Sequence, residues 1–358
     1  MARKKKFFSF KKQSLTVKIL ISALALLMFI VFIKGFETFR EIYMSNVVLH
    51  GQKTSYVCIP TGSKLEDVSN LLYEKNYIVN KRSFEWLAEK MNYRHHVHPG
   101  RYKLKNHMSN NSLIKLLRSG EQEPVHLVFN SIRTKDEFAE KIASQIEAKK
   151  EAVLDLLNDA DFLSKYNFKP ATVMAMFIPN TYDIYWNTSA KKFLGKMYNE
   201  YNRFWTDSRI AKAKNIGLSK VEVITLASIV SEESNKVDEM PKIAGVYMNR
   251  LNKGMKLQAD PTIRFALNDF TIKRVLNKDL EVKSPYNTYL YEGLPPGPIC
   301  IPSLAAINSV LNYKHHNYLY FCAKEDFSGY HNFASTVPQH KQNAIRYQKA
   351  LNQRNIFK

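Results

Sequence analysis

Two adjacent glutamates, Glu232 and Glu233, stand at the end of a segment whose pattern predicts a helix. An apolar stripe of that helix, which includes Leu226 and Val230, leads to Glu233, whereas Glu232 lies about 100° further round the axis. A carboxyl at the edge of an apolar face is desolvated, which raises its pKa and lets it carry a proton near neutral pH. Such an acid suits protonation of a glycosidic oxygen. The alternative is a solvated glutamate in the last helical turn.

A third acid, Asp260, lies near these glutamates in the order of motifs. It follows a predicted helix over 242–251 that ends before Gly254, and an Asp-Pro pair favours a turn. Asp260 is therefore either the cap of a helix over 262–267 or a residue of the same cleft. If it faces Glu233 across a water, the pair would suit ordinary glycoside hydrolysis.

Aromatic and amide side chains follow in a stretch that is rich in proline and glycine. Tyr286, Asn287 and Tyr289 precede a loop over 293–299 with three prolines and two glycines, a composition that holds side chains rigidly. Tyrosine rings stack on sugar faces, and an asparagine amide pairs with N-acetyl groups. Paired strands are predicted over 318–321 and 329–333, which leaves His331 as a candidate cleft residue.

The elements that hold these residues form the second half of the chain. Ser219 is the predicted cap of the glutamate helix, and a closing helix is predicted over 338–352. Between the two halves, residues 121–175 are predicted to be mostly helical, 177–182 a turn-rich loop, and 189–214 one long charged helix.

A smaller unit precedes them. A strand over 56–60, a helix opened by a Ser63–Glu66 capping box, a helix over 82–91, a strand over 100–104 and a helix ending at Gly120 are predicted. This β-α-α-β unit with an appended helix carries no catalytic cluster. Three histidines in a loop resemble a metal tract, but this spacing is more often solvated: His95, His96 and His98.

The N-terminus predicts a membrane anchor. A basic block precedes an apolar run over 19–33, which nears the roughly 20 residues that cross a bilayer. The greater positive charge before the run predicts a cytoplasmic N-terminus at 1–16, a transmembrane helix at 17–34 and an external remainder. No small-x-small site follows the run, which argues against a cleaved signal peptide. Residues 34–55 show no regular pattern and are predicted to be a connector.

Composition sets wider limits. A chain of 358 residues is long enough for about two domains, and its net charge of +21 implies an anionic neighbour. An external location makes nucleic acid an improbable partner and favours the membrane surface or an anionic wall polymer. The three cysteines, Cys58, Cys300 and Cys322, exclude a disulfide framework or a zinc ribbon.

Several motifs in one order resemble the YceG-like endolytic murein transglycosylases, the MltG family. They are the run 226–233, Asn249-Arg250-Leu251, residues 254–262, residues 284–289, residues 293–299 and the late His331 with Phe333. The family helix usually carries two acids separated by one residue, and here Ser231 takes the first position. The Glu-Ser pair at 233–234 is also similar to that of lysozyme-like transglycosylases. Asn130-Ser131 and Asn180 replace acidic positions of the family outside these motifs.

The resemblance implies an α+β fold with a transmembrane helix, a small LysM-like subdomain at 50–125, and a YceG-like catalytic domain at 126–358 with an open cleft. Glu233 would be the catalytic residue. The implied substrate-binding residues are Asn249, Arg250, Gln258, Asp260, Tyr286, Asn287, Tyr289 and His331. No metal or cofactor is expected.

A lytic transglycosylase, as the resemblance implies, needs one carboxyl that acts first as acid and then as base. It would cut the MurNAc–GlcNAc bond of peptidoglycan and leave a 1,6-anhydro end, which would terminate or release nascent strands. Peptidoglycan strands, the cytoplasmic membrane and peptidoglycan synthases are the implied partners. Two alternatives remain at this point: a hydrolase that uses Glu233 and Asp260, and a non-catalytic scaffold that binds the wall.

Overall fold

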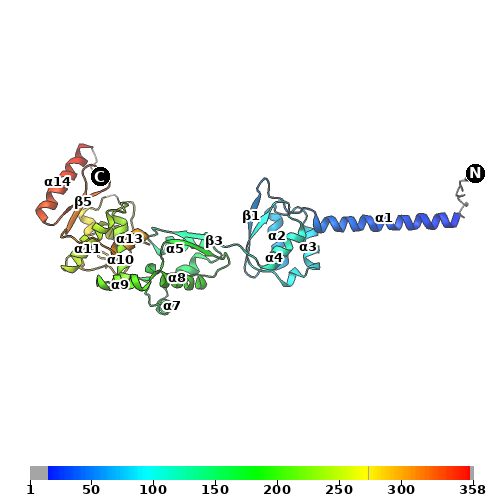
Figure 1. Cartoon of the computed structure of the whole chain (residues 1–358), viewed down its shortest axis with the longest axis horizontal. Helices are drawn as coiled ribbons and strands as arrows, with labels where there is room; N and C mark the ends of the chain where they lie inside the picture. Colours follow the sequence, from blue (N-terminus) through cyan, green and yellow to red (C-terminus); the bar gives the residue numbers. More distant parts are fainter. Residues whose placement is uncertain (1–14, 273, 355–358) are drawn as a thin grey trace, which may run out of the picture. The chain divides into compact units, whose positions relative to one another are not determined.

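The computed structural model describes residues 15–272 and 274–354, and the chain divides into two compact units (Figure 1), Met1–Glu123 and Pro124–Lys358. Each unit has its own hydrophobic core. Among the described residues, every sheet consists of two antiparallel strands, and both strands belong to the same unit. The expected α+β class is therefore confirmed, with helices in the majority.

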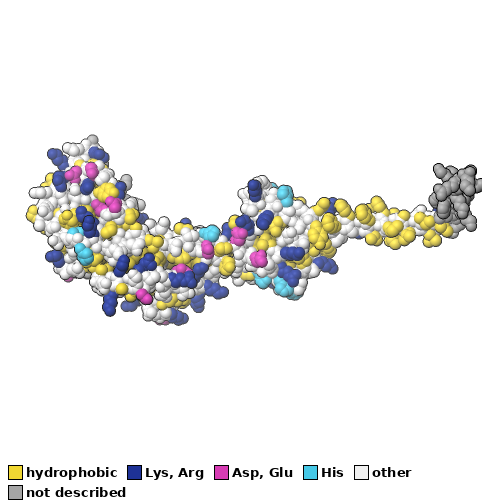
Figure 2. All heavy atoms as spheres, in the orientation of Figure 1, with side chains coloured by type: hydrophobic (Ala, Val, Ile, Leu, Met, Phe, Trp, Pro, Cys, Tyr) yellow, Lys and Arg dark blue, Asp and Glu magenta, His cyan; other side chains and the backbone are white. Residues whose placement is uncertain are grey.

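The first helix, α1 (Leu15–Tyr43), has an apolar surface that no other described part of the chain covers (Figure 2). Its 29 residues span about 43 Å, more than the roughly 30 Å of a bilayer core. Within 15–272 and 274–354 it is the one helix long and apolar enough to cross a membrane. The predicted span at 17–34 lies within it, whereas most of the predicted tail at 1–16 lies outside the described residues.

The helix does not stop where the apolar run ends. The prediction of a connector over 34–55 was wrong for its first part, since α1 continues to Tyr43 and contacts α3 and α4. Asn110 donates its amide to the carbonyl of Glu41 at 2.9 Å, and Ile42 packs on the core of the small unit. The end of α1 is therefore part of the small unit.

The small unit follows the predicted order of elements. It contains β1 (Thr54–Ile59), α2 (Leu65–Glu74), α3 (Lys81–Lys90), the 3₁₀ turn η1 (Tyr93–His95), β2 (Gly100–Lys105) and α4 (Asn110–Ser119). Strands β1 and β2 pair antiparallel, and Gly120 ends α4 in the left-handed conformation, with φ 72°. The Ser63–Glu66 capping box was wrong by one residue: α2 begins at Leu65, and Asp67 accepts from the Lys64 N–H at 2.8 Å.

The first part of the second unit combines helices with two antiparallel strands that lie far apart in the sequence. It contains β3 (Val125–Phe129), α5 (Lys135–Ala143), α6 (Lys150–Asn158), α7 (Ala160–Ser164), η2 (Val173–Met176), β4 (Asn180–Ile184), α8 (Ala190–Phe204) and α9 (Asp207–Asn215). Strand β4 begins in the predicted loop 177–182 and pairs with β3, which lies in the stretch that was predicted to be mostly helical. The predicted long helix over 189–214 is two helices, because Thr206 caps a new one at Asp207.

The remaining elements surround one buried helix. They are α10 (Lys220–Glu233), α11 (Met240–Asn252), α12 (Asp260–Leu267), η3 (Asn277–Glu281), α13 (Leu304–Leu311), β5 (Tyr320–Ala323), β6 (His331–Ala334) and α14 (Val337–Gln353). Helix α10 contacts α9, α11, α12 and α13. Ser219 caps it as predicted, with Glu222 completing a capping box. Strands β5 and β6 pair antiparallel, as expected.

Helix α10 is buried on every side from Val223 to Val230, so the apolar stripe understated its burial. Polar side chains on it bind the proline-rich loop: Ser228 accepts from the Ile299 N–H at 3.0 Å, and Ser231 from the Ser303 N–H at 3.3 Å. In that loop Gly297 lies so close to Ala171 that a Cβ would overlap its carbonyl oxygen. The loop thus fixes the end of the helix that carries Glu233.

Candidate active site

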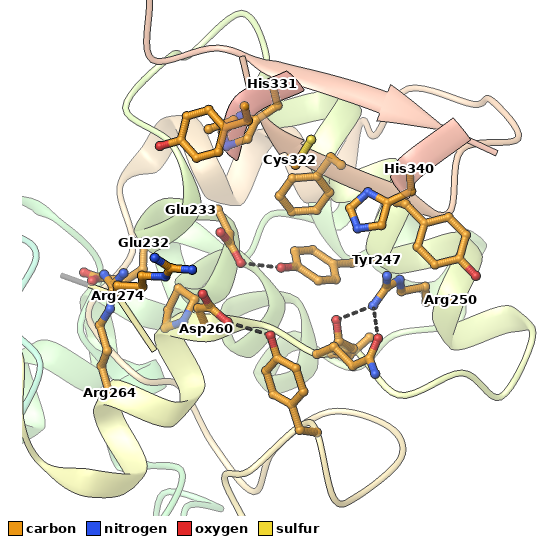
Figure 3. Close-up of a pocket in the computed structure, with 18 of the residues that line it drawn as sticks. Glu232, Glu233, Tyr247, Arg250, Asp260, Arg264, Arg274, Cys322, His331 and His340 are labelled. Atoms are coloured by element: carbon orange, nitrogen blue, oxygen red, sulfur yellow. Dashed lines mark hydrogen bonds between the residues drawn. The ribbon is translucent and has the colours of Figure 1, made fainter. Parts of the chain in front are cut away.

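A pocket of about 880 Å³ lies in the second unit, at the C-terminal end of α10 (Figure 3). Helices α11, α12 and α14 and strands β5 and β6 contribute to its wall. The predicted site residues that line it are Glu233, Arg250, Gln258, Asp260, Tyr289 and His331. Asn249, Tyr286 and Asn287 do not line it, so the structure gathers six of the nine predicted residues.

Glu233 faces this pocket and is held by one neighbour. The hydroxyl of Tyr247, on α11, donates to Glu233 Oε1 at 2.5 Å. Burial raises the pKa of Tyr247 well above its ordinary value, so its phenol stays protonated as a donor. This bond occupies Oε1 of Glu233. The other carboxyl oxygen, Oε2, is left to face the pocket and to carry or release a proton.

The pKa of Glu233 is raised to about 7, chiefly because burial disfavours the ionised carboxylate. The Tyr247 hydrogen bond opposes the rise, the charge of Asp260 adds to it, and Arg264 and Arg250 lower it. The side chain keeps part of its surface open to the pocket. At neutral pH this carboxyl is therefore poised to give up and to take back a proton.

Glu232 has a different environment. Arg133 donates to it through Nε at 3.2 and 3.3 Å and through Nη2 at 3.0 Å. The Glu232 side chain lies off the predicted apolar stripe, yet it is only 13% exposed. What separates the two glutamates is the partner: a guanidinium for Glu232 and a phenol for Glu233.

Asp260 is the second carboxyl that faces the pocket without an ion-pair partner in the described chain. It begins α12, but it makes no side-chain cap there; its Oδ1 accepts instead from the Tyr289 hydroxyl at 2.6 Å. Thr288 fixes this arrangement, since its Oγ1 accepts from the Ala259 N–H at 3.0 Å and lies 2.8 Å from Thr262 Oγ1. The capping interpretation of Asp260 is therefore wrong, and the cleft interpretation matches its position.

Several of the predicted polar residues bind the protein's own backbone. Asn249 donates to the carbonyls of His316 and Tyr318 at 2.7 and 2.9 Å. Asn287 is fully buried and donates to the carbonyls of Leu280 and Val282, both at 2.8 Å. Their amides hold the loops around the pocket, and a role in binding substrate stays a prediction.

Three further predicted residues differ in the same way. Arg250 lines the pocket, but it donates to the carbonyls of Leu319 and Leu257 at 2.7 and 2.8 Å. Gln258 is exposed on the pocket wall. The ring of Tyr286 packs against Phe265, with centroids 4.7 Å apart.

His331 lies at the opposite wall of the pocket, at the start of β6 (Figure 3). Its Nδ1 lies 2.7 Å from Glu239 Oε2, and its backbone N–H donates to Glu239 Oε1 at 2.9 Å. The ring also meets Phe321 edge-on at 5.2 Å. The buried Glu239 carboxylate thus fixes the ring and leaves Nε2 as the nitrogen that can serve the pocket.

The comparisons with known proteins identify the family. The model of the YceG-like family matches residues 57–346, which covers most of the chain and every pocket residue named above. The chain belongs to the YceG-like family. The recognition made from the spaced motifs is thereby confirmed.

Two relatives and one structure illustrate the family. The chain is 28% identical over 338 residues to the endolytic murein transglycosylase of Bacillus subtilis, which covers 90% of this chain and 92% of that protein. It is 28% identical to the endolytic murein transglycosylase of Streptococcus pneumoniae (strain D39), of which it spans only 62% while 87% of this chain is covered. The crystal structure of a YceG-like protein of Listeria monocytogenes matches with a TM-score of 0.55 and 29% identity, over 81% of this chain and 98% of that one.

Sequence reasoning missed several residues of this YceG-like pocket. Tyr247 lies 14 residues after Glu233, a spacing that two packed helices can bridge, but nothing in the sequence marks it. Arg264, Arg274 and His340 also line the pocket, and the pattern assigned none of them a role. In 15–272 and 274–354, no group of three His, Cys, Asp or Glu side chains could hold a metal ion.

Proposed function

We propose that this chain is a membrane-anchored lytic transglycosylase of peptidoglycan with Glu233 as its acid and base. The observation that carries the proposal is one carboxyl with a pKa near 7, bound to Tyr247, in the main pocket of a YceG-like domain. The curated relatives, which are named endolytic murein transglycosylases, support the same reaction.

In the first step, protonated Glu233 gives its proton to the oxygen between N-acetylmuramic acid and N-acetylglucosamine. The bond from C1 to that oxygen breaks, and positive charge develops at C1. The carboxylate that remains is stabilised by the Tyr247 hydrogen bond, which strengthens as the oxygen becomes negative. Tyr247 is thus a positioning residue for the acid.

In the second step the same carboxylate acts as base. It takes the proton of the muramic C6 hydroxyl, whose oxygen bonds to C1 and forms a 1,6-anhydro end. Glu233 regains its proton, no water is consumed, and no second carboxyl is needed. A pKa near the working pH favours both transfers.

The hydrolytic alternative rests on Asp260, which faces the same pocket. If Asp260 activated a water against C1, the product would carry a reducing end instead of an anhydro end. Asp260 Oδ1 accepts from the Tyr289 hydroxyl, so Oδ2 is the oxygen that would have to activate the water.

The test is the product made from purified glycan strands. We expect anhydro-muramic ends from internal cuts, identified by mass spectrometry of the fragments. Reducing ends would establish the hydrolase instead. Intact strands that nevertheless bind the protein would leave only the wall-binding scaffold.

We place the catalytic unit outside the cytoplasmic membrane, with the N-terminus inside. Helix α1 supports an anchor by its length and its uncovered apolar surface. The small unit would act as a LysM-like glycan-binding module, the second unit would hold an open catalytic cleft, and cutting near the membrane would release nascent strands. Protease added to spheroplasts should destroy the body and spare a tag on the N-terminus; a soluble, shortened chain would contradict the anchor.

A further inference from the structure

Two arginines of the pocket have no use in the chemistry above. Arg264, on α12, and Arg274, in the segment after it, both line the pocket on the side of Glu232 and Glu233 (Figure 3). In the described part of the chain, neither side chain has an ion pair, and neither donates a hydrogen bond.

The environment of Arg264 is unusual for a guanidinium. Its Nε is buried and finds no acceptor among the described residues. An unsatisfied buried donor of this kind costs free energy, and bonds to a charged acceptor are the strongest that it can gain. Arg264 also lies close enough to Glu233 to lower the pKa of that carboxyl.

The other arginines near the pocket are already engaged. Arg133 pairs with Glu232, and Arg250 donates to main-chain carbonyls. When Glu233 is protonated, Asp260 is the one pocket carboxylate that no cation of the described chain offsets. The pocket therefore presents an excess of positive charge, concentrated at Arg264 and Arg274, to any ligand.

We propose that Arg264 and Arg274 form a subsite that binds a carboxylate of the glycan strand next to the bond that is cut. The planar, forked guanidinium groups match a carboxylate in geometry as well as charge. The inference rests on the proposed function for the identity of the polymer, but the recognition itself is a binding property of this pocket.

The carboxylate has two sources in such a strand. The lactyl group of muramic acid carries one when the stem peptide is absent, and the stem peptide carries its own when it is present. The lactyl carboxylate lies on the sugar whose C1 reacts, and the stem peptide extends from that same sugar. A subsite there would select the muramic residue, rather than N-acetylglucosamine, for the position whose glycosidic oxygen Glu233 protonates.

The test compares carboxylate strands with their amides. Four strand preparations are needed: peptide-free strands with lactyl carboxylates, the same strands as methylamides, peptide-bearing strands with free carboxylates, and the same strands amidated. Dissociation constants are measured by calorimetry in detergent with the full-length Glu233→Gln protein, whose cleavage is slow enough to leave the strands intact during the titration. Arg264→Gln and Arg274→Gln are then added to this background, and Arg203→Gln, an exposed arginine of α8, serves as the control.

We expect each pocket substitution to weaken binding of the recognised carboxylate form about tenfold, the loss of one charge-assisted contact. Binding of the matching amide should change little, Arg264→Lys should recover part of the loss, and Arg203→Gln should have no effect. If the substitutions weaken binding of the peptide-free carboxylate strands, the lactyl group is the source of the carboxylate. If they weaken binding of the peptide-bearing carboxylate strands, the stem peptide is the source.

An equal loss of affinity for carboxylate and amide strands, or no loss of affinity for either, would overturn the proposal. Unfolding temperatures of all variants separate a folding defect from a binding defect, and exposed Arg274 gives a second site where a folding defect is not expected. Because binding is measured without cleavage, a protein that never cuts strands would refute the proposed function and still leave this comparison decisive.

Discussion

Tyr247 on α11 donates its hydroxyl to Glu233 on α10 at 2.5 Å, and this contact joins two helices at the floor of the pocket. The phenol occupies Oε1, so the acid has one defined oxygen with which to meet the substrate. It also moderates the effect of burial, since a carboxylate that accepts a hydrogen bond ionises more easily.

Glu233→Gln should reduce cleavage by about 10²–10⁴-fold, because an amide cannot donate and recover a proton. Strand binding should survive, since the amide can still hydrogen-bond the bridging oxygen. The measurement is the rate of anhydro-end formation, with Glu232→Gln as the matched control, which should lose far less. Asp260→Asn decides between the reactions: a loss as large as that of Glu233→Gln would favour two carboxylates.

Tyr247→Phe removes the hydrogen bond and should raise the pKa of Glu233 above about 7, because the bond lowers it in the native protein. The limb of the pH–rate profile on which the acid loses its proton should move to higher pH. We expect a loss of about tenfold at the optimum from poorer positioning. An unchanged pH profile with reduced activity would mean that the phenol acts only through packing.

The two glutamates show what sequence reasoning could and could not supply. Capping by Ser219 and the helical period depend on residues close in sequence, so the position of Glu233 at a helix end was predictable. The Arg133–Glu232 pair joins residues 99 apart, and β3 pairs with β4 across four intervening elements. Such contacts depend on tertiary packing, which no local pattern encodes.

Two asparagines show a second limit of sequence reasoning. Asn249 and Asn287 stand in motifs that suit sugar recognition, but the structure uses both to bind main-chain carbonyls. A side chain that shapes a site and one that contacts the ligand give the same sequence signal. The hydrogen-bond partners distinguish them, together with burial in the case of Asn287, which is complete.

Stability should depend on pH through Glu233. Its folded pKa of about 7 exceeds the ordinary value of 4.5, so the folded state binds more protons between these values and loses stability as pH rises through that window. Glu233→Gln removes this loss. The unfolding temperature of this variant should exceed that of the native chain by an amount that grows from pH 5 to pH 8. At pH 8 the difference corresponds to a free energy of unfolding on the order of 2 kcal/mol. A constant difference across this range would contradict the raised pKa.

Arg133→Met should destabilise the protein while sparing the chemistry. It leaves the poorly exposed carboxylate of Glu232 without a cation, which costs about 1–2 kcal/mol because the arginine itself is partly exposed. The double variant Arg133→Met/Glu232→Met should recover part of this loss. Thermal unfolding measures the effect, and cleavage per folded molecule should change little. Loss of cleavage at unchanged stability would instead give Glu232 a direct role.

The small unit should contribute to binding of the polymer and not to cleavage of the glycosidic bond. The core of the second unit is formed entirely by its own residues, and the described small unit contributes no side chain to the pocket. A fragment of residues 124–358 should therefore fold; a start at 126 would remove Val125, which pairs with Ile184 at the end of β3. We expect this fragment to cut short soluble strands at a rate close to that of the full chain and to need more polymeric glycan for half-maximal rate, since remote contacts supply binding energy rather than proton transfer.

The comparison needs both proteins in the same detergent, so that loss of α1 does not change the solvent. A folded fragment that fails to cut at high strand concentration would show that the small unit takes part in the reaction.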